Sequence, residues 1–279
     1  MGLTWVRKKK IEITLKVIFW LLTVSAYLVT GAVGYKNFLV PKQPLSASSC
    51  RPRDNVKVIK LLGNLQPYKK DNGQDKQAET LSSDLVRDIE LADKDRNIKY
   101  ILLEIDSPGG NITAAEEIIN TIKRANKPTI AIIRSQGLSA AFWVAVSANR
   151  VYAYPTSQIG NIGVTDSYVD YSKQDLQQGI TFNQLSSRKF KDMMKSDKPL
   201  TTEERANVMD GVMQKYQIVL GSISQSRHLD KSVLLPWADG RLFTSSQALA
   251  TGLIDSIGSK YDVLDYIKQQ IGQEPRLCE

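Results

Sequence analysis

The sequence has very few of the residues that bind metal ions or serve as a histidine base. Its 279 residues include a single histidine, His228, and only two cysteines, Cys50 and Cys278. No metal-ligand spacing can be built from these three residues, so we expect no metal and no cofactor. A Ser-His-Asp triad would have to use His228, but its polar surroundings near the expected end of a long helix indicate a surface histidine.

The two cysteines lie near the two ends of the region that follows an apolar N-terminal segment. In an oxidising compartment Cys50 and Cys278 can pair, or both can stay unpaired at frayed ends of the domain. The residues alone do not decide between these alternatives.

One uncharged run is long enough to cross a membrane. Residues 17–35 carry no charge, and about 20 residues are needed for a spanning helix. A cationic cluster from Arg7 to Lys10 precedes the run, and such a cluster stays in the cytoplasm. We therefore expect a single-pass protein of the inner, or cytoplasmic, membrane with its main domain outside. A cleaved signal peptide ending near Gly34 is the alternative.

The excess of positive charge has a simple origin in this arrangement. Lysines and arginines that flank a membrane segment account for the net charge of +8. No basic stripe interleaved with aromatic residues is present, so we expect no nucleic-acid partner.

The composition divides the chain into five stretches. We expect a basic cytoplasmic N-terminus at residues 1–16, a membrane anchor at 17–35 and a proline- and serine-rich linker at 36–55. One globular domain is expected at residues 56–272, followed by a short C-terminal tail at 273–279.

The globular region alternates between strand-like and helix-like patterns. Strands are expected at 56–62, 98–105, 129–133 and 150–153, and helices at 79–91, 114–125, 139–148, 202–226 and 261–271. Thr113 is expected to cap the second helix, with Glu116 completing a capping box. Strands that alternate with helices predict an α/β fold with a parallel sheet and right-handed crossovers.

Two strand-to-helix junctions carry candidate chemistry. Ser139 begins a helix of small residues, where the amide of Ala140 is free to bind an oxyanion, although an ordinary N-cap serine is the alternative. The pair Gly109-Gly110 follows a buried strand and allows the backbone to turn its amides toward a ligand. A tight turn formed by Asp106 and Ser107 is the alternative there.

A serine nucleophile without a histidine needs another base. A lysine can act as that base if its pKa falls toward neutrality. Three candidates lie in one basic stretch, Lys189, Lys191 and Lys195, and a solvated surface charge is the ordinary explanation for each. Spacing does not choose among them.

Six motifs, taken in order, resemble those of the signal peptide peptidase A family of Ser/Lys-dyad serine proteases. They are Asp106-Ser-Pro-Gly-Gly110, Gly137-Leu-Ser-Ala-Ala-Phe-Trp143, the stretch 151–164, Lys191-Asp-Met193, the stretch 199–204, and the stretch 239–255. The resemblance covers roughly residues 55–270. It implies a Clp-protease/crotonase-like parallel sheet with crossover helices, in addition to the N-terminal transmembrane helix.

The resemblance also implies roles for five residues. Ser139 corresponds to the nucleophile and Lys191 to the general base, while the amides of Gly110 and Ala140 correspond to the oxyanion hole. Asn161 stands where the family commonly carries a serine that orients the base. The implied function is a membrane-anchored endopeptidase that forms an acyl-enzyme on signal peptides or other membrane-associated peptides, assembled into homo-oligomeric rings.

Two departures from the family pattern leave an alternative open. The nucleophile is followed by Ala140-Ala141 where the family often has two glycines, and Asn161 replaces the orienting serine. A catalytically impaired regulatory scaffold of the same fold is therefore the competing hypothesis. An acyl-CoA-handling crotonase relative is disfavoured because an extracytoplasmic domain would not meet acyl-CoA.

Overall fold

The computed structural model describes residues 50–69 and 78–279. Residues Cys50–Glu279 form one compact unit. Within the described ranges, no helix has both the length and the apolar character needed to cross a bilayer. The expected membrane segment at 17–35 lies outside the described residues.

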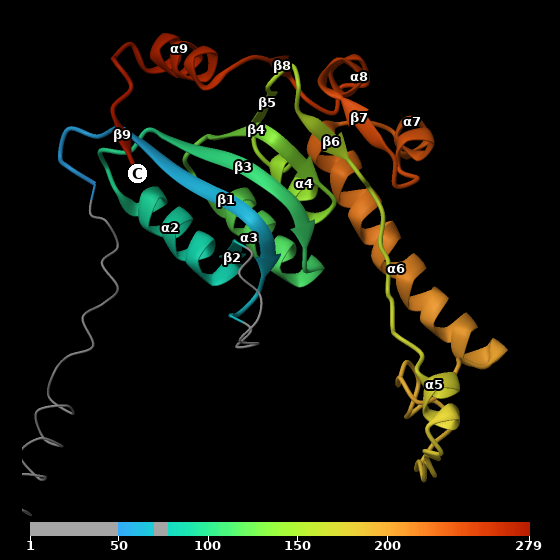
Figure 1. Cartoon of the computed structure of the whole chain (residues 1–279). Coiled ribbons are helices and arrows are strands. Elements are labelled where there is room, and N and C mark those ends of the chain that lie inside the picture. The colour runs from blue at the N-terminus through green and yellow to red at the C-terminus, as the bar shows by residue number, and fades with distance from the viewer. Residues whose placement is uncertain (1–49, 70–77) are drawn as a thin grey trace, which may run out of the picture. The chain divides into compact units, whose positions relative to one another are not determined.

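A parallel sheet forms the centre of the unit (Figure 1). Its main strands run in the order β2-β1-β3-β4-β5-β8, and this order requires crossover connections between neighbours. The strands are β1 (Val56–Gln66), β2 (Glu79–Leu81), β3 (Tyr100–Gly110), β4 (Thr129–Leu138), β5 (Arg150–Ala153) and β8 (Ser256–Ile257). β6 (Gln158–Gly160) extends the pairing of β4, and β7 (Leu242–Thr244) pairs antiparallel with β6.

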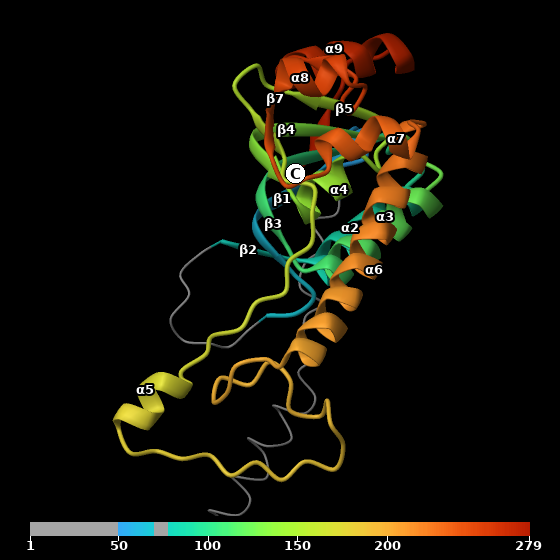
Figure 2. The same ribbon diagram turned by 90° about the vertical axis from the view of Figure 1, so that its right-hand side faces the viewer.

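Helices cover both faces of this sheet (Figures 1 and 2). One face packs against α2 (Ser82–Lys94), α3 (Ile112–Arg124), α4 (Ala140–Ala145) and the later part of α6 (Thr202–Arg227). The opposite face packs against α9 (Lys260–Ile271), whose Val263 and Ile267 are fully buried. The first halves of β3 and β4 are nearly continuous apolar runs, because they are buried on both faces of the sheet.

The expected α/β architecture and its parallel sheet are confirmed, with shifted boundaries. β5 and the start of α6 lie where the sequence predicts them. The Asp106–Gly110 segment continues β3 as an extended strand, although a turn was the alternative considered for it. The helix expected at 79–91 begins only at Ser82, because the preceding residues pair with β1 as β2.

The predicted cap of α3 is wrong. Asn111 is the N-cap, and its side chain accepts a hydrogen bond from the Ala114 amide at 3.1 Å. The helix therefore begins at Ile112, so Thr113 and Glu116 both lie inside it. An asparagine in an extended conformation is an effective cap, and it ends β3 at the same point.

The compact unit extends beyond the expected domain at both ends. Residues Leu277–Cys278 form β9, which pairs with the start of β1. The end of β1 pairs with β2 along the same edge. A disulfide joins Cys50 to Cys278 across a sequence separation of 228 residues. This bond answers the question that the cysteine spacing left open, and it ties the two ends of the unit together.

Residues 165–201, which we call the arm, leave the sheet after β6 and return at the start of α6. The arm contains one short helix, α5 (Ser172–Gln177), and in Figures 1 and 2 it lies beyond the sheet, beside the first turns of α6. Its exposed apolar side chains are Val169, Tyr171, Leu176, Ile180, Phe182, Leu185 and Phe190. An isolated domain rarely leaves so many apolar groups in water.

We expect removal of the disulfide to destabilise the unit without changing its fold. The double variant Cys50→Ser/Cys278→Ser should lose about 2–5 kcal/mol of unfolding free energy, because the bond restricts the unfolded chain. Denaturant unfolding measured without reductant tests this expectation. Wild-type protein treated with reductant is the control and should unfold like the variant. An unchanged midpoint in the double variant would contradict the expectation.

Candidate active site

Ser139 lies on a strained turn between β4 and α4. Its backbone has φ 51° and ψ −123°, a conformation that residues other than glycine rarely adopt. Such strain costs about 1–3 kcal/mol and is typical of functional sites. A sharp strand-to-helix turn of this kind projects a nucleophilic serine in α/β-hydrolases. The Ser139 side chain makes no capping hydrogen bond, so its hydroxyl is not used as an ordinary N-cap.

The backbone around Ser139 is held so that one amide remains available. The Ser139 amide donates to the Gly160 carbonyl at 2.8 Å, and the Ser139 carbonyl accepts from the Trp143 amide at 3.0 Å. Ala140 is the first residue of α4, so its amide has no acceptor within the helix. This amide adjoins the Ser139 hydroxyl, as an oxyanion donor must.

The glycine pair at the end of β3 packs directly against this turn. A Cβ atom on Gly109 would lie 2.9 Å from the Ser139 Cβ and 3.0 Å from the Ala140 nitrogen. A Cβ atom on Gly110 would lie 2.2 Å from the Leu65 carbonyl oxygen of β1. Only glycine fits at either position, and both have positive φ, 105° and 147°. The backbone of the pair therefore reaches the nucleophile from one side while it touches β1 on the other.

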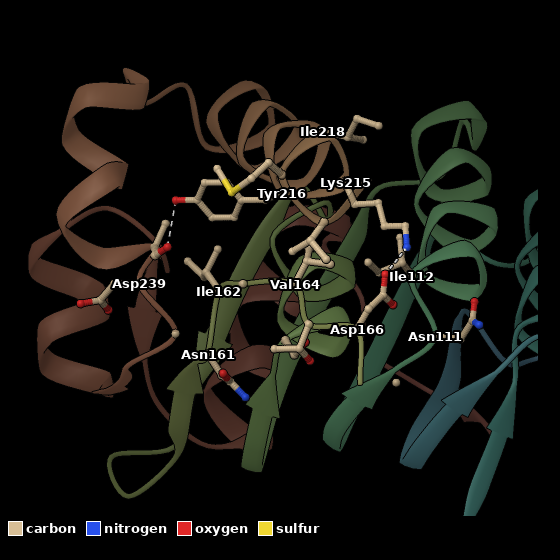
Figure 3. A pocket seen from close by; sticks show the side chains of 18 of the residues that line it. Asn111, Ile112, Asn161, Ile162, Val164, Asp166, Lys215, Tyr216, Ile218 and Asp239 are labelled. Atoms are coloured by element: carbon tan, nitrogen blue, oxygen red, sulfur yellow. Dashed lines mark hydrogen bonds and ion pairs between the residues drawn. The ribbon is translucent and has the colours of Figure 1, made fainter. Parts of the chain in front are cut away.

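Ser139 opens into a cleft of about 990 Å³ (Figure 3). Gly110, Ser139 and Asn161 lie at one part of its lining. The remainder is formed by α6, by the start of α3 and by the chain that follows β6. Its apolar lining residues are Ile112, Ile162, Val164, Met209, Val212, Met213, Tyr216, Ile218 and Ala238.

Polar contacts surround the apolar wall of the cleft. The Lys215 ammonium lies 2.9 Å from the Asp166 carboxylate, which joins α6 to the segment after β6 (Figure 3). The Tyr216 hydroxyl donates to the Ala238 carbonyl at 2.9 Å. Asp239 accepts hydrogen bonds from Arg241, and these bonds hold the pKa of the Asp239 carboxyl below its usual value. The lining of the cleft thus combines apolar side chains with polar and charged ones.

Four of the five predicted site residues come together. Gly110, Ser139 and Asn161 line the cleft, and Ala140 directly follows the nucleophile. Asn161 has φ 52°, and its amide donates to the Arg241 carbonyl at 2.8 Å, so the β6–β7 pairing fixes its position. Lys191 is the exception, since it is not one of the described residues that line the cleft.

Lys191 is exposed on the arm, beside the start of α6. The next residue, Asp192, is buried, and its carboxylate lies 3.2 Å from the Lys198 ammonium. Lys198 also contacts Glu204 at 2.8 Å, and this hydrogen bond lowers the pKa of Glu204. These contacts fasten the arm to the first turn of α6. Lys191 itself is exposed at the surface beside this attachment.

The neighbouring lysines differ in their partners. Lys189 forms an ion pair with Glu203, whereas no ion pair involves Lys191 or Lys195 within the part of the chain that the structure describes. Among the same residues, no group of three or more potential metal ligands lies together.

Sequence reasoning missed the residues of α6 that form the cleft wall. Met209 and Met213 are one helical turn apart, line the cleft and are each 47% exposed. Apolar residues occur all around α6, so periodicity did not identify one buried face. The signal available in the sequence was the presence of apolar residues on more than one side of α6. Some of these residues line the cleft and others pack into the core.

The comparisons with known proteins agree with the fold and the motifs. The sequence model of peptidase family S49 matches residues 121–274, a range that includes Ser139 and Lys191 and begins after Gly110. In structure, the chain is similar to a mutant ClpP1 from Listeria monocytogenes, with a TM-score of 0.51 and 12% sequence identity. That match covers 76% of this chain and 94% of the other, and it supports a Clp-protease-like fold.

Two relatives illustrate the sequence similarity. A protein of Enterococcus faecium, provisionally named signal peptide peptidase SppA, is 29% identical over 180 residues, which are 63% of this chain and 52% of the relative. The chloroplastic serine protease SPPA of Arabidopsis thaliana is 26% identical over 223 residues, which are 78% of this chain and 32% of the relative. The chain thus spans about half of the first relative and a third of the second.

We expect Gly109→Ala to remove the reactivity of Ser139. The added methyl group would displace the Ser139–Ala140 backbone, which lies too close to accept it. Labelling by a fluorophosphonate should fall at least tenfold, since one misplaced donor in an oxyanion hole costs about 10²–10³ in rate. The matched control is Gly272→Ala, which also has positive φ but meets no atom within 4 Å. Equal labelling of both variants would contradict the expectation.

Proposed function

The chain belongs to peptidase family S49, and from this premise we propose that it is a serine endopeptidase in which Ser139 attacks the peptide carbonyl and Lys191 of a neighbouring subunit accepts the hydroxyl proton. The observation that carries the proposal is the strained turn at Ser139. Its uncapped hydroxyl opens into the cleft beside two backbone amides that other groups leave available.

The chemistry follows from this arrangement. The Ser139 oxygen forms a bond to the substrate carbonyl carbon, and the oxyanion so formed is stabilised by the amides of Gly110 and Ala140. Collapse of this intermediate breaks the peptide bond, and the departing amine takes the proton that the lysine accepted. Water then attacks the acyl-enzyme while the lysine accepts a proton from it. Collapse of the second intermediate breaks the ester bond, the Ser139 oxygen takes the proton back from the lysine, and the acid product leaves.

The position of Lys191 supports a site shared between two subunits. The lysine is exposed, it is held on the arm by the contacts of Asp192, and it does not line the cleft of its own chain. The exposed apolar side chains of the arm supply a surface for a second copy. We propose that assembly into a closed oligomer brings this Lys191 to the Ser139 of the next subunit.

Asn161 is proposed to orient the incoming lysine. It lines the cleft, and its backbone is fixed by the carbonyl of Arg241. Its side-chain carbonyl can accept one hydrogen bond from an ammonium group, which is the role that a serine hydroxyl would otherwise fill.

The lining of the cleft supports apolar peptides as substrates. Side chains such as Ile162, Val212 and Tyr216 offer apolar contacts along its length. Methionines at 209 and 213 adapt to varied shapes, which suits a site that accepts several sequences. Cleaved signal peptides and other membrane-associated peptides fit this description, and we propose them as the substrate class.

The disulfide supports a location outside the cytoplasm. Bonds such as that between Cys50 and Cys278 persist in oxidising compartments and are rare in the cytosol. Together with the uncharged run at 17–35, this supports an anchored enzyme of the cytoplasmic membrane whose domain is extracytoplasmic.

The competing candidate is a scaffold without peptidase activity. The observation that favours it is the position of Lys191, because the predicted base does not line the cleft of its own subunit. Fluorophosphonate labelling of the wild type and of Ser139→Ala separates the two. Labelling of the wild type alone supports the peptidase, and an unlabelled wild-type oligomer supports the scaffold.

The shared site predicts complementation between two inactive variants. Ser139→Ala and Lys191→Ala should each abolish peptide hydrolysis, and oligomers formed by co-expression of the two should regain part of it. Activity returns because some junctions combine an intact serine with an intact lysine from the next subunit. If the base came from the same chain as the serine, the mixed oligomer would stay inactive. Peptide hydrolysis measured on the purified mixed oligomer distinguishes these two cases.

Matched variants identify the base. Lys191→Arg should also be inactive, because a guanidinium stays protonated, whereas Lys189→Ala and Lys195→Ala should be much milder. His228→Ala should retain full activity, since the mechanism does not use a histidine. Loss of activity in Lys189→Ala with retention in Lys191→Ala would show that a different lysine is the base.

The proposed anchor predicts a membrane-bound protein with an accessible domain. The full chain expressed in a bacterium should resist carbonate extraction, because a spanning helix remains in the bilayer. Protease added outside spheroplasts should digest residues 50–279, and a variant that lacks residues 1–35 should lose the membrane association. Recovery of mature protein that begins near residue 35 would contradict a retained anchor.

A further inference from the structure

Ser107 lies where two ladders of the sheet change register. Between β1 and β3, Leu62 pairs with Asp106 and the next pair is Asn64 with Gly109. Between β3 and β4, Ile105 pairs with Ile133 and the next pair is Ser107 with Gly137, so β4 advances by four residues while β3 advances by two. Ser107 is therefore surrounded by irregular backbone, and it is fully buried.

The Ser107 hydroxyl bonds to the backbone on both sides of this irregularity. It donates to the Gly63 carbonyl of β1 at 2.6 Å, and it accepts from the Gly109 amide at 3.1 Å. A hydroxyl has one proton to donate, and that proton is committed to Gly63. The side chain thus links Gly63 of β1 to the first residue of the glycine pair.

These bonds settle which amide of the glycine pair remains available. The Gly109 amide is used by Ser107, and the Asn111 amide donates to the Leu65 carbonyl at 2.8 Å. In a parallel ladder the pair Leu65–Gly110 uses the amide of Asn111 and leaves that of Gly110 directed to the other side. Gly110 and Ser139 line the same cleft, and the preceding Gly109 packs against Ser139 and Ala140.

The glycines do not fix this direction by themselves. Gly109 and Gly110 both have positive φ and no side chain, so neighbouring groups must hold their peptide units in place. The ladder pair Leu65–Gly110 holds the unit between them on the β1 side, and the Ser107 hydroxyl holds the unit that precedes it through the Gly109 amide.

We propose that Ser107 is a positioning residue for the oxyanion hole. It does not touch the substrate, and it acts by holding the Gly109 amide so that the Gly110 amide points at the oxyanion. This inference rests on the proposed function, in which Gly110 and Ala140 stabilise the acyl-transfer intermediate.

Ser107→Ala in the full-length oligomer tests the proposal. We expect kcat for an apolar peptide to fall about tenfold or more, with KM unchanged, because the interaction acts on the transition state. The matched control is Ser245→Ala, which also removes a fully buried serine hydroxyl that donates to a backbone carbonyl, that of Tyr154 at 2.6 Å. Its kcat should stay near that of the wild type. Ser107→Thr keeps the hydroxyl and should recover part of the lost kcat.

Binding measurements separate positioning from a general structural role. A peptide boronic acid, which forms a tetrahedral adduct with the serine, should bind Ser107→Ala at least tenfold more weakly than the wild type. An intact peptide should bind Ser139→Ala and Ser139→Ala/Ser107→Ala with equal affinity. A matching loss of peptide affinity, or an unchanged kcat in Ser107→Ala, overturns the proposal.

If the variants do not fold, a measurement on the wild-type protein tests the proposal instead. In protein labelled with ¹⁵N-glycine, the amide proton of Gly110 should shift strongly when the boronic acid binds, while that of Gly109 should not. A large shift at Gly109 overturns the proposal. Hydrolysis by Ser139→Ala would overturn the proposed function as well, whereas an inactive Ser139→Ala with a fully active Ser107→Ala overturns only this inference.

Discussion

The site depends on the contact between the Gly109 α-carbon and the Ser139–Ala140 backbone. No side chain fits between these two segments, so the ends of β3 and β4 determine where Ser139 stands relative to the amides proposed as its oxyanion donors. Parallel strands that end side by side commonly hold such sites. The contact also accounts for the strained backbone of Ser139. The turn after β4 has to pass the glycine pair while the Ser139 amide still donates its hydrogen bond to the Gly160 carbonyl.

Much of the fold could be predicted because its strands are apolar and its helices periodic. The failures occurred where distant backbone decided the outcome. β2 was taken for the start of a helix, since only its pairing with β1 makes Glu79–Leu81 extended. Thr113 was chosen as a cap because nothing local shows that Asn111 already ends the strand. The Cys50–Cys278 bond depends on the pairing of β9 with β1, which local sequence does not reveal.

The site was predictable to a similar degree. Ser139 and the glycine pair were found because a strand-to-helix junction exposes amides wherever it occurs. No local rule selected Lys191, since its surroundings are those of an ordinary surface lysine, and only the family motif pointed to it. In the proposed shared site this exposure is expected, because a base supplied by a neighbour need not be buried in its own subunit. The walls of the cleft on α6 were missed for a related reason, as a helix that faces two environments has no single apolar stripe.

The disulfide at the edge of β1 also has a mechanical consequence. Tension that reaches the domain through the chain before Cys50 passes at once to Cys278 and to the hydrogen bonds between β9 and the first residues of β1. These points lie at the starts of the strands, whereas Ser139 and the glycine pair lie at the opposite ends of β4 and β3. A pull on the chain that precedes Cys50 would therefore load one end of the sheet, whereas the cleft lies at the other end.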